Sequence, residues 1–116
     1  MALRKFMERI TKPVDELDRE ELTTWCNSSG CVPINEAELR KPVCVSGEVR
    51  SVRIVPRAGA DALEAAVYDG RGSLIAVFLG RRKIPGISPG RRLQLEGVVS
   101  RADGVKVMYN PLYTLF

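Results

Sequence analysis

The sequence predicts an α+β chain that is mainly β, in which a short helical segment (residues 1–40) precedes a domain of five strands (residues 41–116). Before Pro42 the apolar residues recur at helical spacing, and after it they alternate with polar residues, which is the period of a strand. A length of 116 residues suits one domain with a small appendage.

The front segment contains three candidate helical stretches. Residues 3–10 place apolar side chains on one helical face, and residues 15–22 form an acidic second helix that ends near Trp25. Residues 27–30 indicate a turn, and residues 34–39 allow one more helical turn before Pro42. We therefore expect a helical, acidic front.

The strands follow from Pro42 onward. In the first, residues 43–54, the apolar parity changes between Val49 and Val52, which predicts a β-bulge or bend near Arg50 and Ser51. Four more strands are predicted at residues 63–67, 74–79, 93–99 and 105–109. The third is apolar on both faces, so we expect it to be covered on both sides.

Five strands in about 70 residues, a long bent first strand and a longest connection between strands three and four are typical of a five-stranded OB-fold barrel. Gly47 and Gly97 suit the tight corners of such a barrel. Ile84 and Ile87, in the long connection, are candidates to plug the barrel where many OB folds carry a helix. An SH3-like barrel is the main alternative, but it usually has shorter strands and no long connection before strand four.

Four motifs occur in one order: V-x-G-x-V at residues 45–49, D-G-x-G at 69–72, G-x-x-L-x-L-x-G at 90–97 and N-P at 110–111. This order resembles OB-fold domains of the tRNA-anticodon and RecG-helicase-wedge kind, although the wedge has His-Pro in place of N-P. The stretches LGRRKIPGISPGRRL and YNPLY resemble small stand-alone OB-fold proteins of actinobacteria. The resemblance covers residues 42–113 and implies an OB fold that binds nucleic acid.

Charge is divided unevenly along the chain. Residues 1–40 carry six basic and eight acidic side chains, whereas residues 41–116 carry twelve basic and six acidic ones. An acidic front with a basic body favours a polyanionic partner of the second part.

Enzyme classes find little support. The chain has no histidine, the commonest general base, and no glycine-rich stretch matches a phosphate-binding loop. We therefore expect neither an enzyme nor a cofactor.

Three cysteines, an odd number, favour a reduced, cytoplasmic protein, and no apolar stretch resembles a membrane span or a signal peptide. No zinc site is expected from Cys26, Cys31 and Cys44, because a fourth ligand is missing. After oxidation, a Cys26–Cys31 disulfide is the favoured alternative.

OB folds bind single strands on the outer face of strands two and three, framed by the loops between strands one and two and between strands four and five. The sequence predicts a basic groove there that binds single-stranded or branched DNA or RNA with low sequence specificity. Tyr68 has outward parity and could stack on a base, whereas Phe78 and Tyr109 are expected in the core. The candidate residues are Arg53, Arg57, Tyr68, Arg71, Arg81, Arg82, Arg101 and Lys106.

Two alternatives stay open. Each arginine could simply solubilise the barrel. The protein could instead be an interaction or regulatory module, in which residues 1–25 mediate self-association or dock a protein partner, or in which the acidic helices cover the binding face. The position of the front segment on the barrel distinguishes an open binding groove from an interaction module.

Overall fold

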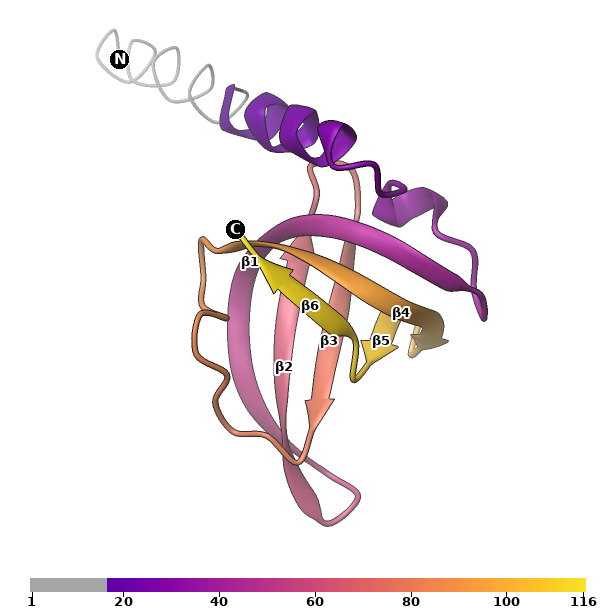
Figure 1. Ribbon diagram of the computed structural model, residues 1–116. Coiled ribbons are helices and arrows are strands. Elements are labelled where there is room, and N and C mark those ends of the chain that lie inside the picture. The colour runs from indigo at the N-terminus through magenta and orange to yellow at the C-terminus, as the bar shows by residue number, and fades with distance from the viewer. Residues whose placement is uncertain (1–16) are drawn as a thin grey trace, which may run out of the picture.

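The computed structural model describes residues 17–116, which are mostly β (Figure 1). A helix covers residues 17–28, and a 3-10 turn, η1, spans Ile34–Glu36. The predicted helix at residues 3–10 lies outside the described residues. The strands are β1 (Pro42–Arg57), β2 (Ala60–Tyr68), β3 (Ser73–Leu79), β4 (Arg92–Ala102), β5 (Val105–Tyr109) and β6 (Leu112–Leu115). The chain is therefore α+β and mainly β, as predicted.

Five of these strands pair in a closed ring. β1 pairs with β2, β2 with β3, β3 with β5, β5 with β4, and β4 with β1. All of these pairs are antiparallel except β3 with β5, which is parallel. The ring confirms the five predicted strands and the order in which the chain forms them.

A sixth strand, β6, was not predicted. Asn110 adopts a left-handed conformation (φ 48°) before Pro111, and this kink ends β5. After the kink the chain returns to β4 and pairs with residues 93–96, next to the stretch that pairs with β5. Pro111 locally indicates the end of a strand. However, β4 is long enough to pair with β6 as well as with β5.

The predicted irregularity in β1 is present. The register between β1 and β2 shifts between Val49 and Ser51, so Arg50 is the extra residue of a β-bulge. Residues 42–48 pair with β4, and residues 48–57, on either side of the bulge, pair with β2. The bulge thus lets one strand belong to both halves of the ring.

The interior of the ring is apolar, and the long connection between β3 and β4 contributes to it. Ile84 and Ile87 are only 2% and 5% exposed and belong to the main core, as expected for a plug. Gly47 lies where β1 passes closest to β2, since a Cβ atom there would stand 2.6 Å from the Val67 side chain. The remaining members of this core come from all five strands of the ring and from η1.

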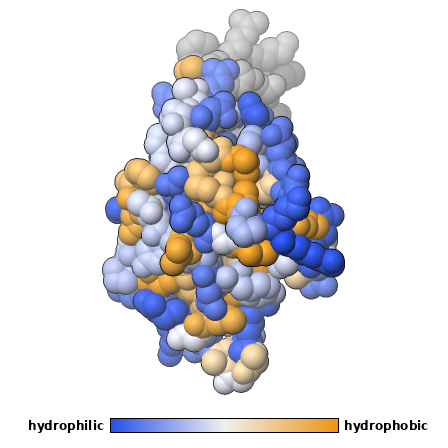
Figure 2. Space-filling view, turned by 45° about the vertical axis from the view of Figure 1, so that its right-hand side comes forward, coloured by the Kyte–Doolittle hydropathy of each residue, from blue (hydrophilic) through white to orange (hydrophobic). Residues whose placement is uncertain are grey.

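The helix at residues 17–28 sits on the end of the ring next to the β2–β3 turn (Figure 1). Leu22 and Cys26, four residues apart on one helical face, are buried, and Thr23 packs against Gly70 in the turn. The helix continues beyond its predicted end near Trp25, whereas η1 is shorter than the predicted turn over residues 34–39. No helix among residues 17–116 is long and apolar enough to cross a membrane. The face of the molecule in Figure 2 mixes hydrophobic with hydrophilic residues.

The expectation of reduced cysteines is wrong, and so is the alternative of a Cys26–Cys31 disulfide. Cys31 forms a disulfide with Cys44, and Cys26 is a free, buried thiol. The helix directs Cys26 toward β1, where its thiol donates to the Ser46 carbonyl (3.5 Å), and burial raises the pKa of this thiol. Because the loop after the helix runs back along β1, Cys31 meets Cys44 instead.

Candidate nucleic-acid interface

The ring has two outer faces with different surroundings. Side chains that alternate with the core point outward from β2, β3, β5 and the second half of β1. We call this surface the arginine face. Its central residues form a small cluster separate from the core, in which Ala62, Val77 and Val107 are buried and Ile75 and Ala102 are partly buried.

The centre of the arginine face carries short side chains, which we call its floor, because two of the outward residues of β2 are alanines. Ala62 and Ala66 point outward there, and the neighbouring strands add Ile75 and Val77. A hollow at one end of the floor is lined by Arg50, Ala66, Val67, Tyr68 and Ser73. The longer polar side chains therefore stand beside a floor of short and apolar side chains, with a hollow at its Tyr68 end.

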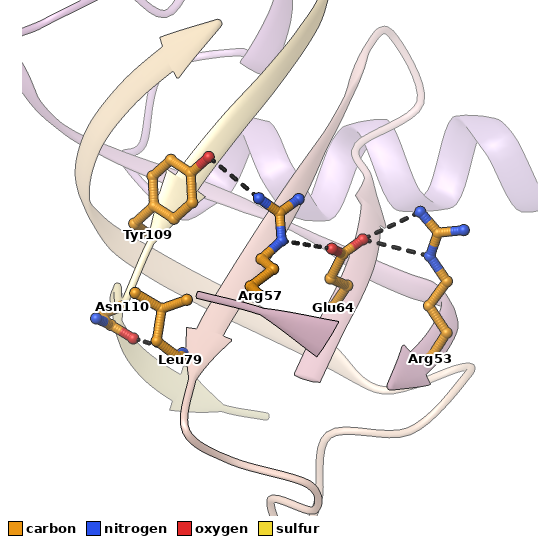
Figure 3. A network of polar contacts seen from close by, with 6 residues as sticks. All are labelled: Arg53, Arg57, Glu64, Leu79, Tyr109 and Asn110. Carbon is orange, nitrogen blue, oxygen red and sulfur yellow. Dashed lines mark hydrogen bonds and ion pairs between the residues drawn. The ribbon is translucent and has the colours of Figure 1, made fainter. Parts of the chain in front are cut away.

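One acidic side chain, Glu64, lies at the centre of the arginine face between two arginines (Figure 3). Glu64 is only 4% exposed. Arg53 donates to its Oε1 from Nε (3.3 Å) and Nη2 (3.1 Å), and Arg57 donates to its Oε2 from Nε (2.9 Å). These bonds hold both guanidinium groups on the face, and the bond to Glu64 raises the pKa of Arg57.

Tyr109 also belongs to the arginine face, which corrects the prediction that it lies in the core. Its ring is 42% exposed and lies 5.8 Å from the Arg57 guanidinium, whose Nη1 donates to the Tyr109 hydroxyl (3.4 Å). On β5 the inward residue is Met108, so Val107 and Tyr109 point outward. Phe78 is in the core as expected.

Asn110 holds the end of β5 against β3 and so sets the position of Tyr109. Its side-chain oxygen accepts from the Leu79 N–H (2.9 Å), and its own N–H donates to the Val77 carbonyl (2.7 Å). Figure 3 shows this bond beside the arginine–glutamate contacts.

Tyr68 lies at the other end of the same face with the outward orientation predicted for it. The Arg50 guanidinium stands 5.0 Å from the ring centre, and Arg50 also pairs with Glu48 (3.4 Å). The Tyr68 hydroxyl donates to the Gly70 carbonyl (3.0 Å) and accepts from Arg19 Nε (3.1 Å). The ring is half-buried, so one part of it is open to a ligand.

The other predicted arginines lie around the ends of the face. Arg82 pairs with Asp61 (3.3 Å), next to the β1–β2 turn, and Arg81 is exposed beside it. Arg71 is exposed in the β2–β3 turn, and Arg101 is exposed on β4 near the β4–β5 turn. These residues form no cluster with Glu64, but they add positive charge to both ends of the face.

Lys106 has a structural role. Its amine donates to the carbonyls of Ile34 (2.8 Å) and Ala37 (3.3 Å), which fastens the η1 turn to β5. Because its donors point at the backbone, we leave it out of the interface.

The opposite outer face, on β4 and the first half of β1, is occupied by the chain itself. We call it the covered face. Ser29 shares a hydrogen bond with Ser46 (2.9 Å), and the Gln94 amide contacts both sulfurs of the Cys31–Cys44 disulfide. The described part of the front segment, residues 17–40, lies here and at the ring end, and its helix reaches the edge of the arginine face, where Arg19 bonds the Tyr68 hydroxyl.

Sequence reasoning missed Glu64, Tyr109 and the pairing of Arg50 with Tyr68. Glu64 gave one usable signal, because it is an acid in the middle of a strand, flanked by alanine and leucine, at a position of outward parity. No local signal marks Tyr109 as outward, since Tyr109 shares its parity with Val105 and Val107, opposite Lys106.

No protein-family model matches this chain, and no curated protein matches it either. The geometry of the arginine face therefore carries the functional proposal.

Proposed function

We propose that the ring of five strands is an OB-fold barrel and that the protein binds single-stranded or branched nucleic acid, without catalysis, on the arginine face. The strand order supports the OB assignment, because β1 pairs with both β2 and β4 while β5 bridges β3 and β4. In this fold the outer face of strands two and three is the surface that binds oligonucleotides. The same surface here is the arginine face.

The observation that carries the proposal is the pairing of arginine with tyrosine at two places on this face. Arg57 lies beside Tyr109 and Arg50 beside Tyr68, with the apolar floor between them. Aromatic rings stack on bases of any identity, and arginine contributes charge and cation–π contacts. Such a surface suits binding with low sequence specificity and a clear dependence on salt.

The position of the front segment favours this proposal over an open alternative. Residues 17–28 pack on the ring end through Leu22 and Thr23 and reach the arginine face at its edge, where Arg19 bonds the Tyr68 hydroxyl. An acidic cover over the groove therefore finds no support in these residues.

A protein-docking role remains the second candidate. Leu17 is 55% exposed, and it lines a hollow with Trp25, Arg92 and the acidic residues Glu20 and Glu21. Residues 1–16, the rest of the predicted docking segment, lie outside the described residues. This candidate predicts binding to a protein or to a second copy at the helix rather than on the arginine face.

The test is a fluorescence-anisotropy titration of labelled single-stranded DNA and RNA of about 12 nucleotides, at salt concentrations from about 50 to 200 mM. We compare the wild type with Tyr109→Ala and with Tyr113→Ala. Tyr113 is a matched control because it is 39% exposed and lies on β6, off the arginine face. We expect Tyr109→Ala to lower affinity about tenfold and Tyr113→Ala to change it little.

Two results would contradict the proposal. One is the absence of binding by folded wild-type protein at the lowest salt. The other is an equal loss of affinity in both tyrosine variants. Sedimentation of the free protein would then test the docking candidate, for which self-association is the expected outcome.

A further inference from the structure

The arginines of the arginine face do not stand free. In one group Glu64 bonds Arg57, and Arg57 contacts the Tyr109 ring. In the other Glu48 pairs with Arg50, and Arg50 stands over the Tyr68 ring. Each group therefore has the same order, carboxylate to guanidinium to aromatic ring, and the two lie at different ends of one apolar floor.

The carboxylates limit what these arginines can offer a phosphate. Arg53 uses Nε and Nη2 on Glu64, while Arg57 uses Nε on Glu64 and Nη1 on Tyr109. Each guanidinium keeps one terminal nitrogen without a bond in these contacts. Two arginines and one glutamate also leave only one net positive charge at the centre of the face.

A phosphate that displaced Glu64 from its arginines would leave a buried carboxylate unpaired. Glu64 is 4% exposed, so water cannot readily replace the lost bonds, and this penalty opposes ligands that bind through charge alone. Unpaired bases avoid the penalty, because they can stack on the tyrosine rings and the apolar floor while the arginine–glutamate bonds stay in place.

We propose that Glu64, assisted by Glu48, is a specificity-determining residue that makes the arginine face favour unpaired bases over bare phosphates. Single strands expose their bases and bind to the face, whereas duplexes and other polyanions expose mainly phosphates and bind weakly. The inference rests on the proposed function for its ligand, but the screening of Arg53 and Arg57 by Glu64 can be measured separately.

The experiment compares Glu64→Gln with Glu96→Gln. Both variants remove one negative charge, and Glu96 is exposed on β4, away from the arginine face. Affinities are measured for single-stranded DNA, duplex DNA and inorganic polyphosphate, a polyanion without bases. We expect Glu64→Gln to strengthen binding of duplex and polyphosphate about tenfold and that of the single strand much less. Glu96→Gln should strengthen all three slightly and equally.

The proposal is overturned if Glu64→Gln changes the ratio of single-strand to duplex affinity no more than Glu96→Gln does. It is also overturned if Glu64→Gln weakens polyphosphate binding, since Glu64 would then only position the arginines. Should Glu64→Gln fail to fold, Glu48→Gln decides. The Glu48 side chain is 22% exposed, so this substitution should be tolerated, and it must lower the same ratio relative to Glu96→Gln.

The three ligands allow a failure of this inference to be distinguished from a failure of the proposed function. If no variant binds single strands, the proposed function fails, whereas a gain in polyphosphate binding confined to Glu64→Gln would still establish the screening. If the wild type binds single strands and polyphosphate affinity is the same in Glu64→Gln and Glu96→Gln, the inference alone fails.

Discussion

The arginine face and the covered face use their polar atoms in different ways. On the covered face, side chains from the front segment bond to β1 and β4, as Cys26 and Ser29 do at Ser46. On the arginine face, the polar contacts run between neighbouring strands of the ring, as between Arg53 and Glu64. The first pattern fastens one part of the chain to another, and the second leaves exposed rings and partly free guanidinium groups.

The comparison shows that positive charge alone does not mark a binding surface. Lys106 and Arg57 are both cations of the predicted interface, yet the Lys106 amine is bonded to two backbone carbonyls and Arg57 stands beside an exposed ring. Substitutions on the covered face should therefore cost stability and spare binding. Substitutions of the exposed rings and guanidinium groups on the arginine face should do the reverse.

The largest effect is expected from the disulfide on the covered face. Replacing Cys31 and Cys44 together by serine removes a link across a sequence separation of 13 residues and should lower the free energy of unfolding by about 3 kcal/mol. Urea denaturation measures this, with Cys26→Ser as the control that leaves the disulfide intact. An unchanged urea midpoint when wild-type protein is reduced would contradict it, and so would a large loss of single-strand affinity in the double variant.

A smaller loss of stability is expected where the two faces share β1. In Gly47→Ala the new Cβ would meet the Val67 side chain at 2.6 Å and the Tyr68 carbonyl at 2.8 Å, so we expect a cost of about 2 kcal/mol. Gly97→Ala is the matched control, because its Cβ would meet the flexible Met108 side chain at 3.1 Å. Thermal unfolding of the two variants checks the order. An equal or smaller cost for Gly47→Ala would show that β1 and β2 can separate there.

Lys106→Met tests the division of roles among the predicted cations. Losing the bonds to Ile34 and Ala37 should cost about 1 kcal/mol of stability and leave single-strand affinity nearly unchanged. Arg101→Met, on the exposed neighbour across the β4–β5 pair, should cost less stability. A drop in affinity as large as that of Tyr109→Ala would place Lys106 in the interface.

The smallest effect is expected from Arg82. Its ion pair with Asp61 is exposed, so Arg82→Ala should change stability by less than about 0.5 kcal/mol. Affinity for single strands should fall about twofold, with a shallower dependence on salt. Arg71→Ala, at the opposite end of the face, should behave alike. A loss near tenfold in either variant would move the main contact from the centre of the face to that end.

Much of the framework could be predicted, because strand periodicity and turn residues act over a few neighbouring positions. The change of parity after Val49 predicted the bulge, and the outward parity of Tyr68 predicted its orientation. Ile84 and Ile87 were expected to be buried because they are the large apolar side chains of a connection rich in proline and glycine.

The site itself was less predictable. The sequence pattern favours the core for Tyr109, because Tyr109 shares its parity with Val105 and Val107 and alternates with Lys106. The pairing of β5 with β3 and β4 turns Met108 inward and therefore Tyr109 outward. Likewise, the sequence favoured the nearby cysteine as a partner for Cys26, whereas the path of the loop along β1 brings Cys31 to Cys44.

The sequence by itself thus determined the order of the strands of the ring, the bulge, the plug and the basic character of residues 41–116. Only the tertiary structure decided which charges are engaged. Glu64 meets Arg53 and Arg57 across two strands, and Lys106 meets Ile34 from far along the chain. Local periodicity tells which residues alternate, but whether an arginine faces a carboxylate, a ring or water depends on which strands the closed ring sets side by side.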